Sequence, residues 1–404
     1  MRAVVWRGVG DIAVEEVADP KIQDPTDAIV RLTASAICGT DLHFIRGTLP
    51  GMKKGTVLGH EGVGIIEELG PAVRNFHAGD RVVIATTIAC GNCSYCRSGY
   101  YSQCDEANPN GPDTAFFGGP EPSGGFPGLQ AERARVPYAN IGLIKLPDEI
   151  SDDQAILLSD IFPTGYMAAE NAEIAQGNTV VVFGCGPVGQ FAIASAHLLG
   201  AGRVFAVDQV PSRLEMARAQ GAEVIDFSEE DPVETLKSLT GGIGPDRAID
   251  AVGMDAERPH AGPAADKLAR EGKDRELDEE LARQAPEQNP QGDNWHPGDA
   301  PSMALQWAVE SLAKAGTLSI IGVYGMANRT FPIGAAMNKN LTIKMGNCNH
   351  RRYIPKLIEL VMARAIDPAQ ILTQKEPLTD AVSAYQAFDT RQASWIKVEL
   401  QMPH

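Results

Sequence analysis

The chain has 404 residues, of which 44% are hydrophobic and 22% are charged, and this length predicts two domains of an ordinary globular protein. A formal net charge of −17 argues against nucleic acids and anionic membranes as partners. No apolar run approaches the ~20 residues of a membrane helix. The seven cysteines are unevenly placed and odd in number, which favours a reducing cytoplasm over a secreted disulfide scaffold.

Residues 1–155 are predicted to be rich in β-strands, because short apolar runs such as AIVRLTA, VGIIEEL and RVVIATT alternate with Gly, Pro and Asp. The stretch 108–128 is too rich in Gly and Pro for regular structure and predicts an extended loop. From residue 178 onward the pattern changes. Apolar strands, the first two at 178–183 and 203–208, alternate with helical segments, which predicts a parallel sheet covered on both faces.

Residues 256–300 interrupt this alternation with a polar, charge-rich segment. We expect a solvated surface insertion that contains one short helix. The alternative interpretation is a flap over a bound cofactor. From about residue 341 the chain returns to mixed segments and ends in the strand-like run WIKVEL.

The segment GCGPVG matches the G-x-G-x-x-G pattern between a predicted strand and a predicted helix. Its glycines allow a pyrophosphate to approach the backbone at a helix N-terminus, and an acidic residue at the end of the next strand binds the ribose hydroxyls. Such a carboxylate repels the 2′-phosphate of NADP, so we expect NAD, although one nearby arginine offers a positive charge. The alternative is a tight turn beside an incidental aspartate. The predicted cofactor residues are Gly184, Gly186, Pro187, Val188, Gly189, Asp208 and Arg213.

Four of the seven cysteines, Cys90, Cys93, Cys96 and Cys104, lie within fifteen residues. Four thiolates on one short loop complete a tetrahedron around Zn²⁺ and leave no open coordination position, which predicts a structural zinc site. Disulfides are disfavoured by the inferred compartment, and the spacing matches none of the usual iron–sulfur runs. A closed site of this kind binds no substrate, so we expect the chemistry elsewhere.

A second set of candidate metal ligands consists of Cys38, His60 and Asp160. A catalytic zinc needs about three protein ligands and one open position. Each residue alone is more often a buried small side chain or a surface histidine. Their joint occurrence beside glycine-rich turns, in a chain with a dinucleotide-binding pattern, favours a catalytic zinc.

In combination, CGTDLH, GHEGVG, GDRV at 79–82, the four-cysteine loop and GCGPVG resemble the zinc-dependent medium-chain alcohol dehydrogenase family. The context D-I-x-P-T-G-Y around Asp160 is similar to the glutathione-independent formaldehyde dehydrogenase branch, since most members have a second cysteine there. The resemblance implies an α/β protein. A GroES-like, β-rich catalytic domain would comprise 1–160 and 341–404, and a Rossmann, doubly wound NAD domain would comprise 161–340.

The resemblance also implies hydride transfer from a primary alcohol or aldehyde hydrate, such as that of formaldehyde, to NAD. Thr40 then passes the proton through the nicotinamide ribose to His43, a solvent-facing base. Glu61 is either an acid that approaches the metal or an outer residue that never binds it.

Several alternatives stay open at this point. They are a polyol or other secondary alcohol dehydrogenase of the same family, and an aldehyde dismutase that holds NAD tightly. A non-catalytic NAD-binding protein is disfavoured because the metal ligands are present. The family resemblance further implies two zinc ions per chain, and a homodimer or homotetramer.

Overall fold

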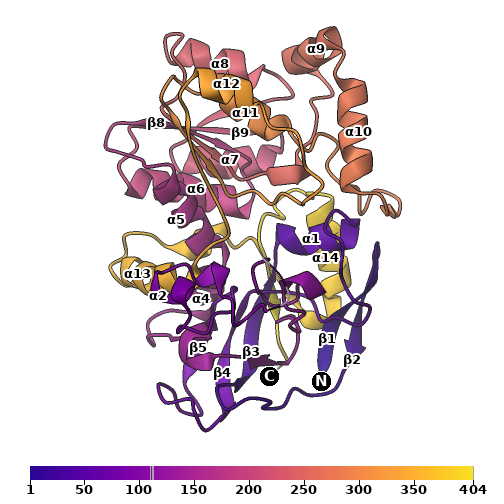
Figure 1. Ribbon diagram of the computed structural model, residues 1–404, viewed down its shortest axis with the longest axis vertical. Coiled ribbons are helices and arrows are strands. Elements are labelled where there is room, and N and C mark those ends of the chain that lie inside the picture. The colour runs from indigo at the N-terminus through magenta and orange to yellow at the C-terminus, as the bar shows by residue number, and fades with distance from the viewer. Residues whose placement is uncertain (110, 112, 404) are drawn as a thin grey trace. The chain divides into compact units, whose positions relative to one another are not determined.

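The computed structural model of the protein describes residues 1–109, 111 and 113–403, with its elements labelled in Figure 1. It divides into two compact units. The first comprises Met1–Pro163, Asn289–Trp295 and Asn347–His404, and the second comprises Thr164–Gln288 and His296–Gly346. Among the described residues, no helix combines the length and apolar character needed to cross a membrane.

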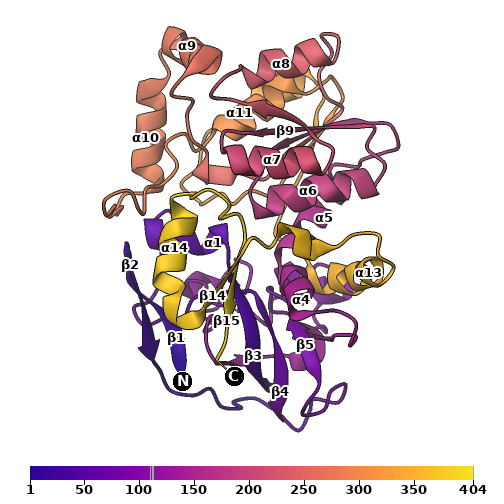
Figure 2. The same cartoon turned by 180° about the vertical axis from the view of Figure 1, so that it is seen from behind.

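The first unit is built on a mainly antiparallel sheet, as expected for the β-rich N-terminal part of the chain. Its strand order is β14-β15-β3-β4-β5-β7, with β6 paired to β3, and β1 and β2 form a separate antiparallel pair. Figure 2 shows β14 and β15, from the end of the chain, beside β3. The strands are β1 (Arg2–Gly8), β2 (Asp11–Glu16), β3 (Ala28–Ile37), β4 (Gly62–Leu69), β5 (Arg81–Ile84), β6 (Arg133–Val136), β7 (Leu143–Lys145), β14 (Gln374–Pro377) and β15 (Val398–Gln401).

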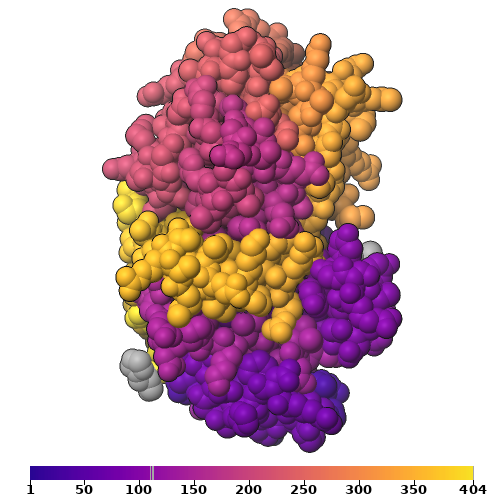
Figure 3. Space-filling model, turned by 90° about the vertical axis from the view of Figure 1, so that its left-hand side faces the viewer, coloured from indigo at the N-terminus to yellow at the C-terminus, as the bar shows by residue number. Residues whose placement is uncertain are grey.

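Short helices surround this sheet. In the space-filling view of Figure 3, the orange-yellow segment that contains α13 lies on the surface, next to purple residues of the same unit. Regular structure among the described residues of 108–128 is limited to the turn η2 (Glu121–Ser123) and isolated bridges at Phe116 and Phe117. The helices are α1 (Gly39–Arg46), α2 (Ser94–Arg97), α3 (Ala139–Gly142), α4 (Asp152–Ser159), α13 (His350–Met362) and α14 (Ala381–Asp389), together with η1 (Tyr101–Gln103), η4 (Pro368–Ile371) and η5 (Leu378–Asp380).

The second unit contains the predicted parallel sheet, with strand order β10-β9-β8-β11-β12-β13. Helices lie on both faces of this sheet (Figure 1). The strands are β8 (Thr179–Phe183), β9 (Arg203–Asp208), β10 (Glu223–Asp226), β11 (Arg247–Asp250), β12 (Thr317–Ile320) and β13 (Thr342–Met345). The boundary between the units at Pro163–Thr164 falls inside α5 (Ile161–Asn171). The other helices are α6 (Pro187–Leu198), α7 (Pro211–Ala219), α8 (Pro232–Leu239), α9 (Gly262–Glu271), α10 (Asp274–Gln284), α11 (Met303–Ser311) and α12 (Ile333–Asn338), with the short 3₁₀ helix η3 (Gly253–Asp255).

Burial on both faces explains why the central strand β8 is an unbroken apolar run rather than an alternating one. Val181 and Phe183 belong to a cluster that includes side chains of α8 and α11. Val180 and Val182 point the other way, into a cluster with side chains of α6 and α7. Alternate residues of one strand therefore serve two separate cores.

The segment 256–300 differs from expectation in two respects. It contains two helices rather than one, α9 with ten residues and α10 with eleven, and Leu268 and Leu277 bury their side chains in the core of the second unit. We also expected the whole segment to belong to the nucleotide-binding domain, but Asn289–Trp295 belongs to the first unit. Periodicity alone missed this because the docking uses backbone and amide groups and one buried aromatic ring, that of Trp295, rather than an apolar stripe.

Docking of Asn289–Trp295 depends on a buried ion pair. Asp389 lies 2.7 Å from the Arg46 guanidinium, and both side chains are almost fully buried. Its other carboxylate oxygen accepts the Trp295 N–H at 2.7 Å, and the Asn294 amide at 3.2 Å. The Trp295 side chain is 2% exposed and lies in the core of the first unit. One carboxylate thus holds both α1 and this segment.

The substitution Asp389→Ala is expected to lower the free energy of unfolding by about 3–5 kcal/mol, because it leaves the Arg46 charge buried without its partner. Denaturant titration measures this change. The matched control is Asp153→Ala, which removes the exposed Asp153–Lys375 pair and should cost less than about 1 kcal/mol. Equal effects of the two substitutions would contradict the role given to Asp389.

Candidate metal and cofactor sites

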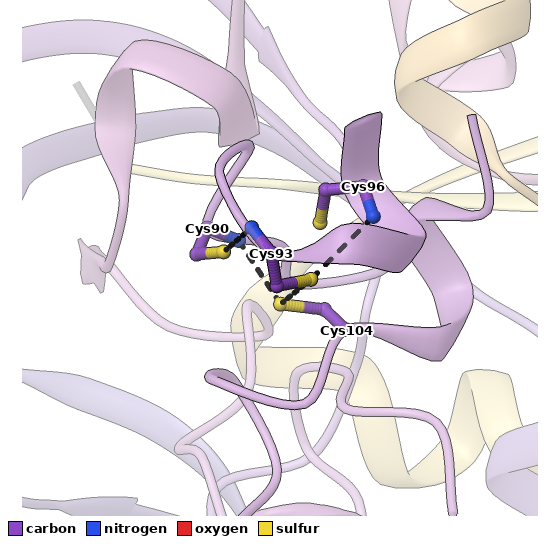
Figure 4. A group of neighbouring side chains, drawn as sticks. All are labelled: Cys90, Cys93, Cys96 and Cys104. Atoms are coloured by element: carbon purple, nitrogen blue, oxygen red, sulfur yellow. Dashed lines mark hydrogen bonds between the residues drawn. The ribbon is translucent and has the colours of Figure 1, made fainter. Parts of the chain in front are cut away.

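The four cysteines of the loop 90–104 converge on one point. Figure 4 shows the side chains of Cys90, Cys93, Cys96 and Cys104 grouped together, and their sulfur atoms all lie within 4.8 Å of one another. A tetrahedron with Zn–S bonds of ~2.3 Å has S–S edges of ~3.8 Å. The Cys93 and Cys104 sulfurs are 3.9 Å apart, which fits this geometry.

Backbone amides of the same loop favour the thiolate form. The Cys93 N–H donates to Cys90 Sγ at 3.3 Å, the Cys90 N–H to Cys104 Sγ at 3.2 Å, and the Cys96 N–H to Cys93 Sγ at 3.4 Å. Although burial opposes ionisation, the bonds donated by Cys96 are among the causes that lower the pKa of Cys93 to about 7. Burial raises the pKa of the Cys96 and Cys104 thiols, and a bound metal would reverse this by stabilising their thiolates.

The second cluster brings together Cys38, His60, Glu61 and Asp160, which are all buried and offer ligand atoms within 4.8 Å of one another. Asp160 Oδ2 lies 3.3 Å from His60 Nε2 and 3.8 Å from Cys38 Sγ. Cys38 caps α1 directly after β3, His60 precedes β4, and Asp160 caps α4. Gly59, with φ of +88°, allows the sharp turn before His60, where a Cβ would meet Gln130 at 2.4 Å.

Asp41 contacts two members of this cluster. One oxygen lies 3.2 Å from His60 Nδ1, and the other accepts the Cys38 backbone N–H at 3.0 Å. A bound metal would require the His60 proton on Nδ1, which leaves the Nε2 lone pair facing Cys38 and Asp160. The Asp41 carboxylate lies beside Nδ1, although this contact does not have the geometry of a hydrogen bond.

Glu61 is paired with Lys397. The Lys397 Nζ donates to Glu61 Oε1 at 2.6 Å and to the carbonyl of Ile37 at 3.0 Å, and both side chains are completely buried. Burial raises the pKa of Glu61 to about 7, although the charge of Lys397 opposes this rise. Glu61 Oε2 has no hydrogen-bond partner among the described residues. This second oxygen is the one free to face a cation.

The charges of the cluster suit a divalent cation. Although burial opposes ionisation, hydrogen bonds from His350 and His60 hold the pKa of Asp160 well below its usual range. Burial raises the pKa of the Cys38 thiol, and a bound metal would reverse this by stabilising the thiolate. The donor set of sulfur, imidazole nitrogen and carboxylate oxygen is one that Zn²⁺ accepts.

Thr40 and His43 both lie on α1, close to Cys38. Thr40 Oγ1 is 3.9 Å from Cys38 Sγ. His43 was expected to face solvent, but the structure buries it to 4% exposure and places its Nδ1 2.9 Å from Thr48 Oγ1. The helix turns His43 inward, so the solvent-facing description was wrong.

The glycine turn of the second unit has the geometry that its pattern predicts. Gly184 has φ of +87°, and a Cβ on Gly189 would lie 1.8 Å from the Gly184 carbonyl oxygen. Gly186 caps α6, whose first residues are Pro187 and Val188. The strand, the turn and the helix N-terminus therefore follow one another as dinucleotide binding requires.

Asp208 ends β9 beside this turn. One oxygen accepts the Cys185 N–H at 2.7 Å, and the other accepts the N–H groups of Gln209 and Val210 at 2.8 and 2.9 Å. The guanidinium of Arg213 also approaches the turn, since a Cβ on Gly186 would lie 3.9 Å from it. The predicted acidic and basic residues are thus both at the glycine turn.

Three buried residues of the first unit were missed from the sequence. Asp41 carried a signal, because it follows Cys38 at the capping-box spacing. Lys397 resembles an ordinary strand residue, and His350 lies 190 positions after the Asp160 that it contacts. No local pattern reveals either of these two.

Comparison with known proteins agrees with this geometry. Residues 24–148 match the family model described as an alcohol dehydrogenase GroES-like domain, and residues 187–264 match the one described as a zinc-binding dehydrogenase. An uncharacterised zinc-type alcohol dehydrogenase-like protein, AdhB of Bacillus subtilis, is 40% identical over 99% of this chain and 100% of its own. The chain belongs to the zinc-type alcohol dehydrogenase family.

Two further relatives extend the comparison. The glutathione-independent formaldehyde dehydrogenase of Pseudomonas aeruginosa is 40% identical over 63% of this chain and 66% of its own. The solved structure of alcohol dehydrogenase TADH from Thermus sp. ATN1 is 33% identical, with complete coverage of both chains and a TM-score of 0.79. The chain is therefore an oxidoreductase with the GroES-like and Rossmann architecture expected of this family.

Replacing Cys96 by Ser is expected to reduce the zinc content from about two ions per chain to about one, because three thiolates no longer close the tetrahedron. Metal analysis of the purified protein measures this. Cys185→Ala, which removes a buried cysteine outside both clusters, should keep both ions. Unchanged zinc content in the Cys96 variant would show that the loop is not a metal site.

Proposed function

We propose that the protein is an NAD-dependent zinc enzyme that oxidises a small primary alcohol or a hydrated aldehyde such as that of formaldehyde. The observation that carries this proposal is the buried meeting of Cys38, His60 and Asp160, with Asp160 where most members of the family have a second cysteine. Zn²⁺ held by these three residues would lower the pKa of a substrate hydroxyl at its open position.

The remaining residues of the site would manage protons and charge. Thr40 and His43 lie three residues apart on α1 and therefore share one face of the helix. Thr40, beside Cys38, would pass the substrate proton toward His43. Glu61, neutralised on one side by Lys397, would keep its second oxygen available to the metal.

The aromatic surroundings of His60 favour a small substrate. The Phe116 ring meets the His60 ring edge-on at 6.1 Å and stacks against Phe44 at 6.2 Å. On this side of His60, these rings would limit the room for a longer alkyl chain. The relative from Pseudomonas aeruginosa, named as a glutathione-independent formaldehyde dehydrogenase, supports the same substrate class.

The proposal predicts rapid NADH formation by the zinc-loaded protein with formaldehyde in the absence of glutathione, and slower turnover of longer primary alcohols. Asp160→Ala should lower kcat/KM by at least about a thousandfold, because the metal contributes several kcal/mol to the reaction. Asp153→Ala, on the neighbouring helix α4, is the control and should leave turnover unchanged.

Activity only on larger alcohols, polyols or other secondary alcohols would support the proposed zinc-dependent reaction but contradict the proposed small substrate. Conversion of aldehyde to equal amounts of acid and alcohol without added NAD would identify a dismutase. Full activity after removal of both metal ions would reject the role given to Asp160 and its partners.

The preference for NAD rests on Asp208. Its carboxylate ends β9 at the glycine turn, where it would bind ribose hydroxyls and repel a 2′-phosphate. Arg213 supplies positive charge nearby, but Asp208 is closer to the backbone of the turn.

Asp208→Ser is expected to lower kcat/KM for NAD roughly 10- to 150-fold, which corresponds to the loss of about 1.5–3 kcal/mol of charged hydrogen bonding. The value for NADP should stay constant or rise. Asp226 pairs with Asp208 in the sheet register and ends the neighbouring strand, so Asp226→Ser is a matched control. A wild-type preference for NADP would contradict the assignment.

We also propose that the protein is a cytoplasmic homodimer or homotetramer. β13 is the edge strand of the second unit's sheet, and Met326, Ile333, Met337 and Met345 expose large apolar side chains in the same part of the chain. A second copy would cover them. Sedimentation as a monomer at micromolar concentration would reject this arrangement. The seven free cysteines fit a reducing compartment.

A further inference from the structure

A buried series of hydrogen bonds begins at the carboxylate of Asp160. Its two oxygens have different partners: Oδ2 faces His60 and Cys38, whereas Oδ1 lies 2.7 Å from His350 Nε2. His350 is the first residue of α13 and is 3% exposed. One oxygen is thus presented to the proposed metal and the other is held by a histidine.

The other nitrogen of the His350 ring is also occupied. Nδ1 lies 3.2 Å from Thr87 Oγ1. In a neutral ring with its proton on Nε2, Nδ1 accepts the Thr87 hydroxyl; in a charged ring, both nitrogens donate. In both arrangements Nε2 carries a hydrogen that points to the Asp160 carboxylate, which is the partner that favours a proton on this nitrogen.

The residue before His350 is bound to the four-cysteine loop. Asn349 Oδ1 accepts the Ser102 backbone N–H at 2.9 Å and the Ser102 hydroxyl at 3.0 Å. Ser102 lies in η1, between Cys96 and Cys104, and both Ser102 and Asn349 are buried. Adjacent residues of one segment therefore contact the two proposed metal sites.

We propose that His350 is a positioning residue for Asp160 and that Asn349 ties it to the four-cysteine loop. The inference rests on the proposed role of Asp160 as a metal ligand. A carboxylate with both oxygens free can rotate or bind a metal through either or both of them. Fixing Oδ1 leaves Oδ2 as a single, directed ligand. The four-cysteine loop, although closed to substrate, would thereby help to set the geometry of the reactive site.

The test compares His350→Leu, which removes the donor, with His350→Gln, whose amide can still donate to Asp160. Competition with a chelator measures zinc affinity, and the four-cysteine site in the same molecule is the internal control. The Leu variant should bind the Cys38–His60–Asp160 zinc 10- to 100-fold more weakly, and the Gln variant should lose only about threefold. The four-cysteine site should keep its zinc in both.

Two results would overturn the role of His350: unchanged affinity in the Leu variant, or equal weakening in the Leu and Gln variants, which would indicate ring packing instead of hydrogen bonding. If the Leu variant does not fold, Thr87→Val takes its place. It should weaken the same zinc severalfold, and unchanged affinity there would count against the proposal.

The link to the four-cysteine loop has its own pair of variants. Asn349→Asp keeps an acceptor for Ser102, whereas Asn349→Leu removes it. With Co²⁺ in the Cys38–His60–Asp160 site, the Leu variant should shift the visible absorption bands and the Asp variant should not. Identical spectra for wild type and the Leu variant would remove Asn349 from the proposal.

The same measurements separate this inference from the proposed function. Wild-type protein that binds no zinc at the Cys38–His60–Asp160 site would contradict the function itself. Wild-type protein that binds two, with His350→Leu indistinguishable from it, would contradict only the positioning role.

Discussion

Acidic side chains concentrated in a buried place are the constraint on which the first unit depends. Cys38, Asp41, Glu61 and Asp160 lie within one small region from which water is largely excluded. Ionised groups in such a place are costly unless each one is paired or hydrogen-bonded. Lys397 pairs with Glu61. The Cys38 backbone N–H donates to Asp41, and the His350 imidazole contacts Asp160. A divalent cation among Cys38, His60 and Asp160 would compensate the remaining negative charge. This arrangement therefore suits a metal ion better than a cluster of neutral side chains would.

The two units use opposite strategies to place their functional groups. In the second unit, the glycine turn, the helix start and Asp208 come from one continuous β–α–β segment, so local chain geometry determines the site. In the first unit, the groups come from the ends of β3 and α4, from the turn before β4 and from segments near the C-terminus. Only the completed sheet brings them together. A local substitution therefore perturbs the first site through partners that are distant in sequence.

This difference explains what could be predicted from the sequence. The strands and helices of the second unit, and the candidate ligands that stand in glycine-rich turns, carry short-range signals that need no knowledge of the fold. The burial of His43 could not be foreseen, because the helix α1 that carries it has polar residues on several sides and tertiary contacts decide which side is covered. The roles of Lys397 and His350 could not be predicted for a related reason. A single basic residue in the sequence does not show which carboxylate it will contact in the fold. The docking of Asn289–Trp295 depends on Asp389, almost a hundred positions later in the chain.

The division of the first unit into three separate stretches bears on the order in which the protein matures. The chain passes from one unit to the other four times, at residues 163–164, 288–289, 295–296 and 346–347. All of the second unit has been synthesised by Gly346, whereas β15, which lies between β14 and β3, is synthesised only later. Since domains generally fold as units once their chain is available, we expect the unit that starts second to be finished first. During that interval Cys38, His60 and Asp160 exist without Lys397, so stable metal loading at the proposed site would follow the synthesis of Lys397 and β15.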